Sequence, residues 1–413
     1  MSRARPPEEA RTAGEAEGMP MRGAACVGDA VAAIDTPALV VDLDAMERNI
    51  ARMAAFAARH GVRWRPHAKM HKCAALAQRL VAAGAVGACV QKTAEAQALA
   101  AGGVLDLYIS NEVVAPAKLA RVAALALDLQ QRGGRLAIAV DSNEGVDRLA
   151  AALAHAQAGA QAAAHTRVGE VIDVFVEVDV GQGRCGLPAG PDAVQLAQRI
   201  TRQAPLRFAG LQAYHGKAQH LRGADERRSA IGAALQLVRD TLDAFAQAGL
   251  AVPLVTGAGT GSMANEAASG LYGELQSGSF LFMDADYAGN AADPAQPVFE
   301  HALFLKSQVI SRSARHAVCD AGHKSHAIDS GLPLVARPEG GVPWRYANGG
   351  DEHGVLHADA GQDLPALGET VWLIPGHCDP TVNLHDELVG VRGGLVDGRV
   401  AELLRVDARG ALR

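Results

Sequence analysis

The chain has 413 residues and 49% hydrophobic content, enough to fill the cores of one large domain and one smaller domain. Its formal net charge of −6 provides no electrostatic basis for binding nucleic acid or an anionic membrane, so we expect small-molecule partners. No apolar run reaches the length of about 18 residues typical of a transmembrane helix, and the six cysteines lack Cys-x-x-Cys spacing, which favours a cytoplasmic protein without a disulfide framework.

The amino-terminal residues 1–30 are rich in Arg, Pro, Glu, Ala and Gly, and we expect a disordered extension there. Over residues 31–295, short apolar runs alternate with amphipathic helical stretches, a pattern typical of βα units around a parallel sheet. Nine runs are predicted as strands: 38–41, 62–65, 86–90, 105–109, 136–140, 172–178, 208–213, 252–255 and 279–283. Eight strands would close a (β/α)8 barrel of the TIM type, and one is left to join another sheet.

The character of the chain changes after residue 295, where glycine and proline interrupt the apolar runs. Predicted strands in this part are 303–310, 317–320, 370–374 and 388–391. We therefore predict a second, mostly antiparallel β domain over residues 296–413.

Polar residues follow many of the expected barrel strands. Active sites of such barrels lie at the carboxyl ends of the strands, so these residues are the first candidates for a site. They are Lys69, Gln91, Arg184, Tyr214, His215 and His220. They are therefore expected to meet at one mouth of the barrel.

Two glycine-containing segments lie late in the barrel sequence. One is the loop 257–261, which contains Thr260, and the other is the pair Gly278 and Ser279 at the start of the last predicted strand. Glycine lets backbone amides approach an anion closely, and barrels often hold a phosphate near their last two strands. Either segment alone could serve only as a tight turn. Both segments, together with a lysine at the first barrel strand, favour a phosphorylated cofactor that bears an aldehyde.

A lysine in a cofactor pocket is useful chiefly as an amine that forms a Schiff base with pyridoxal phosphate. Lys69 is the candidate, and Lys72 is its rival about one helical turn later. Spacing alone does not choose between them.

A candidate metal site follows the predicted strand 370–374. His377 and Asp379 are two residues apart, so on an extended chain they share one face while Cys378 points to the other. An imidazole nitrogen and a carboxylate oxygen directed the same way form half of a divalent-metal site.

Several longer motifs resemble one known family. They are segments 65–69, 91–93, 183–186, 259–262, 274–279, 282–287 and 375–386. Through them the chain, from about residue 36 to 407, resembles the D-threonine aldolase and D-serine dehydratase family of fold-type III pyridoxal-phosphate enzymes, and most of all the 3-hydroxy-D-aspartate aldolases. The resemblance implies an alanine racemase-like barrel with a β domain, and a homodimer.

The resemblance also implies roles for individual residues. It implies that Lys69 is the Schiff-base lysine and that the first strand, 38–43, joins the β domain. The cofactor-binding residues that it implies are Gln91, Arg184, Tyr214, Thr260, Gly278, Ser279 and Tyr287. It places His220 near the substrate hydroxyl, and His377 and Asp379 on the metal.

The residue at position 379 discriminates within the family. Dehydratases that resemble this chain carry cysteine there, a soft ligand that suits Zn²⁺. Asp379 is a harder ligand and suits Mn²⁺, Mg²⁺ or Co²⁺ in preference to Zn²⁺, as in the aldolases. We therefore predict a lyase that cleaves a D-3-hydroxy amino acid, either 3-hydroxy-D-aspartate to glycine and glyoxylate or D-threonine to glycine and acetaldehyde.

Alternatives remain for the activity and for the base. A dehydratase acting on D-serine or 3-hydroxyaspartate is the closer rival, whereas a non-enzymatic pyridoxal-phosphate carrier would have no use for the β domain or the metal residues. His220 is the candidate general base, since the pKa of histidine lies near neutral pH, and a water on the metal could serve instead. His353 is a weaker candidate for the pocket lining. The remaining histidines singled out, His67, His71, His215 and His385, are expected to be structural.

Overall fold

The protein is described by a computed structural model that covers residues 23–164 and 169–413. Its barrel contains eight parallel strands in the order β2-β9-β8-β7-β6-β5-β4-β3. The bounds of these strands are β2 Arg63–Trp64, β3 Ala88–Val90, β4 Asp106–Ile109, β5 Arg135–Val140, β6 Ile172–Glu177, β7 Leu206–Ala213, β8 Val255–Gly257 and β9 Glu274–Leu275. A parallel bridge between His67 and Cys89 joins the two ends of the sheet, so the barrel closes as predicted.

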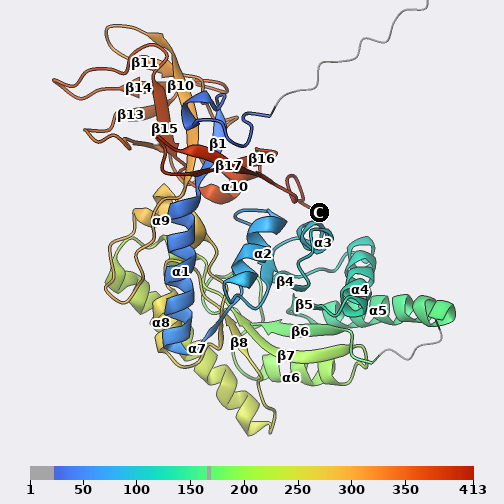
Figure 1. The fold of residues 1–413 in the computed structure, drawn as a ribbon. Helices are drawn as coiled ribbons and strands as arrows, with labels where there is room; N and C mark the ends of the chain where they lie inside the picture. Colours follow the sequence, from blue (N-terminus) through green and yellow to red (C-terminus); the bar gives the residue numbers. More distant parts are fainter. Residues whose placement is uncertain (1–22, 165–168) are drawn as a thin grey trace, which may run out of the picture.

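Helices follow the barrel strands and cover the outside of the barrel (Figure 1). They are α2 Ala74–Ala82, α3 Thr93–Ala101, α4 Pro116–Gln131, α5 Asn143–Ala164, α6 Pro191–Thr201, α7 Ala224–Gln247, α8 Met263–Ala268 and α9 Ala285–Ala288. The 3-10 helices are η1 Val31–Ala33, η2 Lys217–His220 and η3 Ser279–Leu281. The main barrel core is built from apolar side chains of these helices and of the strands beneath them.

Helix α1 (Leu43–His60) shows how local sequence sets an element that joins both parts of the molecule. The Asp42 carboxylate accepts hydrogen bonds from the Asp44 and Ala45 amides and so caps the first turn. Gly61 ends the helix in the left-handed conformation, with φ 64°. Between these caps a buried stripe, Met46, Ile50, Met53 and Phe56, packs with residues of the barrel and of the second sheet in one core.

The second sheet has nine strands and is mostly antiparallel. Its strands are β1 Ala38–Asp42, β10 Leu303–Arg312, β11 Ala317–Cys319, β12 Leu334–Ala336, β13 Arg345–Asn348, β14 Gly354–His357, β15 Thr370–Ile374, β16 Glu387–Arg392 and β17 Arg399–Arg405. Strand β1 pairs antiparallel with β10 and parallel with β16, so the first strand of the chain lies in this sheet. Helix α10 (Cys378–Val382) follows β15 and faces the barrel, and Figure 1 shows the sheet at one end of the barrel.

Two of the nine predicted strands need correction. The prediction of a strand at 279–283 is wrong: the last barrel strand is β9, and residues Ser279–Leu281 form the 3-10 helix η3. The backbone turns there because Gly278 lies against the carbonyl of His67, where a Cβ atom would come within 2.5 Å of the oxygen. Strand β8 begins at Val255, later than predicted, because Pro253 cannot donate a ladder hydrogen bond.

The amino terminus was expected to be disordered over residues 1–30, of which residues 1–22 lie outside the described part. Residues 23–30 contact the β domain: the Gly28 amide donates to the Val400 carbonyl, and Ala30 forms a bridge with Arg399.

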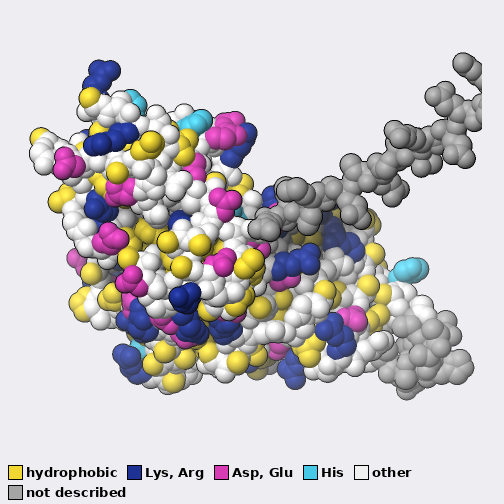
Figure 2. Space-filling model, turned by 45° about the horizontal axis from the view of Figure 1, so that its top comes forward, with side chains coloured by type: hydrophobic (Ala, Val, Ile, Leu, Met, Phe, Trp, Pro, Cys, Tyr) yellow, Lys and Arg dark blue, Asp and Glu magenta, His cyan; other side chains and the backbone are white. Residues whose placement is uncertain are grey.

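None of the helices in the described part combines the length and apolar character needed to span a bilayer. On the face drawn in Figure 2, acidic and basic side chains lie next to one another in several places, which agrees with the small net charge.

Candidate active site

A cavity of about 280 Å³ lies at the carboxyl ends of the barrel strands, where the segment after β15 meets the barrel. Its lining contains all the residues predicted for the Schiff base, the cofactor, the general base and the metal: Lys69, Gln91, Arg184, Tyr214, His220, Thr260, Gly278, Ser279, Tyr287, His377 and Asp379. His215, which was also expected at this mouth of the barrel, is not part of the lining. Gly278 and Ser279 follow the last barrel strand and do not precede it, which places them at this mouth of the barrel. The structure therefore brings the predicted residues together, and their individual roles remain predictions.

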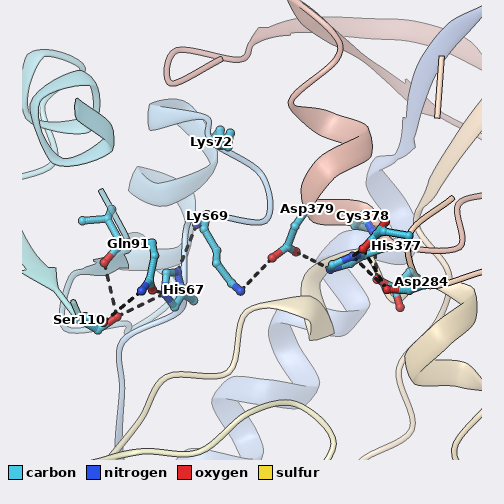
Figure 3. Close-up of polar contacts among 12 residues, drawn as sticks. His67, Lys69, Lys72, Gln91, Ser110, Asp284, His377, Cys378 and Asp379 are labelled. Carbon is cyan, nitrogen blue, oxygen red and sulfur yellow. Dashed lines mark hydrogen bonds and ion pairs between the residues drawn. The ribbon is translucent and has the colours of Figure 1, made fainter. Parts of the chain in front are cut away.

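The two candidate lysines have different surroundings. The Lys69 Nζ lies in the cavity, 3.1 Å from Asp379 Oδ2 (Figure 3). The charge of Asp379 raises the pKa of Lys69. Lys72 points away from the cavity, is nearly buried, and donates from Nζ to Glu95 Oε1 at 2.6 Å. Of the two lysines, Lys69 lines the cavity and Lys72 does not, which favours Lys69 as the lysine for a cofactor bound there.

His67, which was expected to be structural, also lines the cavity. Its Nε2 lies 3.2 Å from Gln91 Oε1 and 3.3 Å from Ser110 Oγ. Burial, followed by the charge of Lys69, lowers the pKa of His67 to about 3, so its imidazole is neutral at physiological pH. The sequence feature that could have indicated a place in the cavity is its position two residues before Lys69, just after a predicted strand.

Four backbone amides near the cavity are candidates for binding an anion. Within the described part of the chain, the amides of Gly259, Thr260, Gly278 and Ser279 have no hydrogen-bond partner in the protein. The loop is held in a sparsely populated conformation, since Ala258 has φ 67°. A Cβ atom on Gly259 would come within 2.4 Å of Gln219 Oε1. These features match the cradle that a phosphate group requires.

His220 is held by a buried carboxylate. Its Nδ1 lies 2.6 Å from Asp286 Oδ2, and the side chain of Asp286 is only 5% exposed. A carboxylate accepts a hydrogen bond from Nδ1–H, which favours the tautomer with its lone pair on Nε2. The ring centroid of His220 lies 5.9 Å from that of Tyr287, which also lines the cavity.

A cation and an aromatic ring lie on another wall. The guanidinium carbon of Arg184 lies 5.9 Å from the centroid of the Tyr214 ring. Burial raises the pKa of Tyr214, which keeps its hydroxyl protonated. No carboxylate of the described chain forms an ion pair with Arg184, so its charge is available to an anionic ligand.

The geometry of the candidate metal ligands differs from the extended chain that was predicted. His377 is extended, with φ −145°, but it caps α10, and Asp379 lies in the first turn of that helix. The two side chains still converge: His377 Nε2 lies 3.8 Å from Asp379 Oδ1. Cys378 is buried, and burial raises the pKa of its thiol well above the usual range, so it is not prepared to act as a thiolate ligand.

These residues fit a divalent cation. Asp379 Oδ1 is buried and has no hydrogen-bond partner among the residues that the structure describes. His377 Nδ1 lies 2.7 Å from Asp329 Oδ2, which leaves Nε2 free on the side of Asp379. A carboxylate that orients a histidine in this way is typical of metal-binding histidines.

The cavity includes residues that the sequence did not single out: Met70, Ser110, Gln212 and Gln276. Gln212 and Gln276 are buried and hydrogen bonded to each other. The sequence feature that could have identified them is a side-chain amide within or next to an apolar strand. His353 is exposed before β14 and does not line this cavity, in contrast to its candidate role.

A closed barrel with an amine, a free set of backbone amides and a β domain at its mouth defines a pyridoxal-phosphate enzyme of the alanine racemase-like fold. Two family matches agree: residues 41–286 match the family described as alanine racemase, N-terminal domain, and residues 302–391 match the putative serine dehydratase domain. The chain belongs to the family of pyridoxal-phosphate enzymes that includes D-threonine aldolase and 3-hydroxy-D-aspartate aldolase, as the resemblance of its motifs indicated.

Individual relatives extend over nearly the whole chain. D-threonine aldolase from Arthrobacter sp. is 43% identical over 94% of this chain and 96% of its own length. 3-Hydroxy-D-aspartate aldolase from Paracoccus denitrificans (strain Pd 1222) is 40% identical over 91% of this chain and 92% of its own. The crystal structure of D-threonine aldolase from Filomicrobium marinum superposes with a TM-score of 0.87 at 44% identity and covers 95% of this chain and 100% of that chain. D-threo-3-hydroxyaspartate dehydratase from Delftia sp. is more distant, at 31% identity over 86% of this chain and 93% of its own.

Proposed function

We propose that the protein is a D-3-hydroxy amino acid aldolase that uses pyridoxal phosphate and a divalent metal. Its substrate is 3-hydroxy-D-aspartate, which gives glycine and glyoxylate, or D-threonine, which gives glycine and acetaldehyde. One observation supports this proposal above the others: the Lys69 amine and the His377–Asp379 pair line the same cavity, and Lys69 Nζ forms an ion pair with Asp379 Oδ2 at 3.1 Å. A cofactor attached to Lys69 would therefore present its substrate to the metal residues.

The residues around the cavity fit pyridoxal phosphate. Lys69 supplies the amine for covalent attachment, and the free amides of the 257–261 and 278–279 segments supply donors for the phosphate. Further residues proposed to hold the cofactor are Gln91, Arg184, Tyr214, Thr260 and Tyr287. When bound, the cofactor acts as the electron sink that makes cleavage at Cα feasible.

His220 is proposed as the general base. Because Asp286 occupies Nδ1, the Nε2 lone pair can accept the proton of the substrate β-hydroxyl. Loss of that proton allows the Cα–Cβ bond to break, and the departing carbon leaves as an aldehyde. Glycine then forms when Cα regains a proton.

His377 and Asp379 are proposed to hold the metal. A cation there would supply Lewis acidity that makes the β-hydroxyl a stronger acid. One nitrogen and one carboxylate oxygen suit Mn²⁺, Mg²⁺ or Co²⁺ in preference to Zn²⁺. The raised pKa of the Cys378 thiol gives no support to a thiolate site.

The dehydratase alternative is disfavoured on two grounds. Asp379 stands where resembling dehydratases have cysteine, and the two aldolases compared above are more similar to this chain than the dehydratase is. We also propose that the enzyme is a cytoplasmic homodimer, which rests on the family resemblance and on the composition of the chain.

A panel of D- and L-3-hydroxy amino acids tests the proposed substrate class. With purified enzyme, pyridoxal phosphate and Mn²⁺, we expect glycine from 3-hydroxy-D-aspartate and D-threonine, with 3-hydroxy-D-aspartate the better substrate. The L-isomers should react at least about 100-fold more slowly, because binding fixes which bond at Cα is activated. Cleavage of L-threonine at a rate comparable with D-threonine would contradict the assignment to D-amino acids.

A further inference from the structure

Helix α9 and its capping residue form a segment, Asp284–Ala288, that lies between the general base and the loop of the metal ligands. The segment is buried at both aspartates, since Asp284 is 0% and Asp286 is 6% exposed. Buried carboxylates are costly unless they accept hydrogen bonds from fixed partners. The partners of these two aspartates lie in different parts of the site.

Asp286 interacts with the residues on the side of the base. One carboxylate oxygen contacts His220 Nδ1 at 2.6 Å, and the other accepts from the Arg222 guanidinium. Arg222 also donates to the backbone carbonyl of Asp286 and to Asn290. The arginine balances the charge of the carboxylate and fixes its orientation, so Asp286 is prepared to hold His220 with its lone pair on Nε2.

Asp284 interacts with the residues on the side of the metal. Its Oδ1 accepts from the Tyr287 amide at 3.0 Å, and its Oδ2 accepts from the Cys378 amide at 3.0 Å, between the two metal-ligand residues (Figure 3). Two backbone bonds reinforce this contact, because the amides of Ala285 and Asp286 donate to the carbonyls of Pro375 and Gly376. The loop before α10 is thus fixed to the same short segment that holds His220.

We propose that Asp286 and Asp284 are positioning residues: Asp286 orients His220 as the proton acceptor, Asp284 orients the His377–Asp379 loop, and α9 sets the two at a fixed separation. This inference rests on the proposed function and extends it. Neither aspartate lies in the cavity lining, so each acts through a neighbour. The aldol reaction requires a base and a cation at the same hydroxyl, which makes their relative placement decisive.

Asp286→Asn tests the base side. Its amide can donate to Nδ1 and so favours the wrong tautomer of His220, with the proton on Nε2. We expect kcat for D-threonine to fall by a factor on the order of 10²–10⁴, the usual contribution of a general base, with KM and the Mn²⁺ dissociation constant within about threefold of the wild type. In a His220→Ala background, Asp286→Asn should cause no further loss, because the partner through which it acts is gone.

Asp284→Asn tests the metal side. The amide of asparagine has one acceptor atom in place of two, so one of the two backbone bonds is lost. We expect the Mn²⁺ dissociation constant, measured by calorimetry on the protein with pyridoxal phosphate bound, to rise by about 10–100-fold. Saturating Mn²⁺ should restore most of the kcat of Asp284→Asn and none of that of Asp286→Asn.

A matched control is Asp293→Asn, since Asp293 is a buried aspartate paired with Arg228 outside the cavity. It should leave kcat and the metal affinity unchanged. Asp286→Ala and Asp284→Ser replace the asparagine variants if circular dichroism shows that either does not fold. A wild-type kcat in the Asp286 variant, an additional loss in the His220→Ala background, or an unchanged Mn²⁺ affinity in the Asp284 variant would overturn the inference. Failure of the wild type to form glycine would instead contradict the proposed function. The two failures can be distinguished because the Mn²⁺ affinity is measured without turnover.

Discussion

Lys69→Ala is expected to abolish both covalent attachment of pyridoxal phosphate and aldolase activity. Among the described residues, Lys69 is the one lysine that lines the cavity, so we expect no second amine to take its place. The absorbance of bound cofactor above about 400 nm should be lost from the purified protein, and glycine formation should fall by a factor of at least 10⁴, within the range that covalent catalysis by the cofactor supplies. The visible spectrum after dialysis and the rate of glycine release check both results.

Lys72→Met is the control for this experiment. It should keep the visible absorbance, because the Lys72 amine is directed at Glu95 and away from the cavity. It should also lower the free energy of unfolding by about 3–5 kcal/mol, since Glu95 then remains as a buried, unpaired carboxylate. If the Lys69→Ala variant retains the visible absorbance and the Lys72→Met variant loses it, the wrong lysine was assigned.

Asp379→Ala has the second large expected effect. With the carboxylate removed, His377 remains as the one proposed ligand, and activity should fall by about 10³-fold or more while the cofactor stays attached to Lys69. Exhaustive chelation of the wild type should have the same effect. Mn²⁺, Mg²⁺ or Co²⁺ should restore the chelated wild type and leave Asp379→Ala inactive.

The measurement is the rate of glycine formation before and after addition of metal, with the visible absorbance as a check that the cofactor is retained. Asp351→Ala provides a control, because Asp351 is an exposed aspartate of the β domain outside the cavity. An enzyme that is indifferent to chelation, or one with wild-type turnover after Asp379→Ala, would contradict the metal assignment.

The arrangement of the barrel could be predicted because its signals are local. Alternation of apolar runs with helical stretches gives the parallel sheet, and the rule that sites lie at strand ends selected residues that the fold does bring together. One failure has a local cause and the other involves a contact between residues distant in sequence. Pro253 delayed the start of β8, and close contact of Gly278 with His67 replaced the expected last strand by a 3-10 helix.

The β domain was less predictable than the barrel. Strands β12 and β13 have three and four residues, too short for an alternating pattern to stand out from loops. Strand β12 pairs with β15, which is distant in sequence, whereas β13 pairs with the next strand, β14. The predicted strands 303–310, 317–320, 370–374 and 388–391 correspond to β10, β11, β15 and β16, whereas β12, β13, β14 and β17 were not predicted.

The parts of the site that escaped prediction are those set by tertiary contacts. Asp284 and Asp286 belong to a recognised motif, but their partners are distant in sequence. Asp286 contacts His220, 66 residues away, and Asp284 contacts Cys378, 94 residues away. Nothing in their spacing indicates those contacts. The choice between Lys69 and Lys72 likewise depended on the turn between them, in which Lys72 adopts φ 53° and points to Glu95.

The products formed from D-threonine test the proposed function most directly. An aldolase breaks Cα–Cβ and releases glycine and acetaldehyde, whereas a dehydratase expels the β-oxygen and releases ammonia and 2-oxobutanoate. With Mn²⁺ and pyridoxal phosphate present, we expect one glycine and one acetaldehyde for each D-threonine consumed, and no ammonia above the background of enzyme-free controls. Stoichiometric ammonia without glycine would contradict the aldolase assignment.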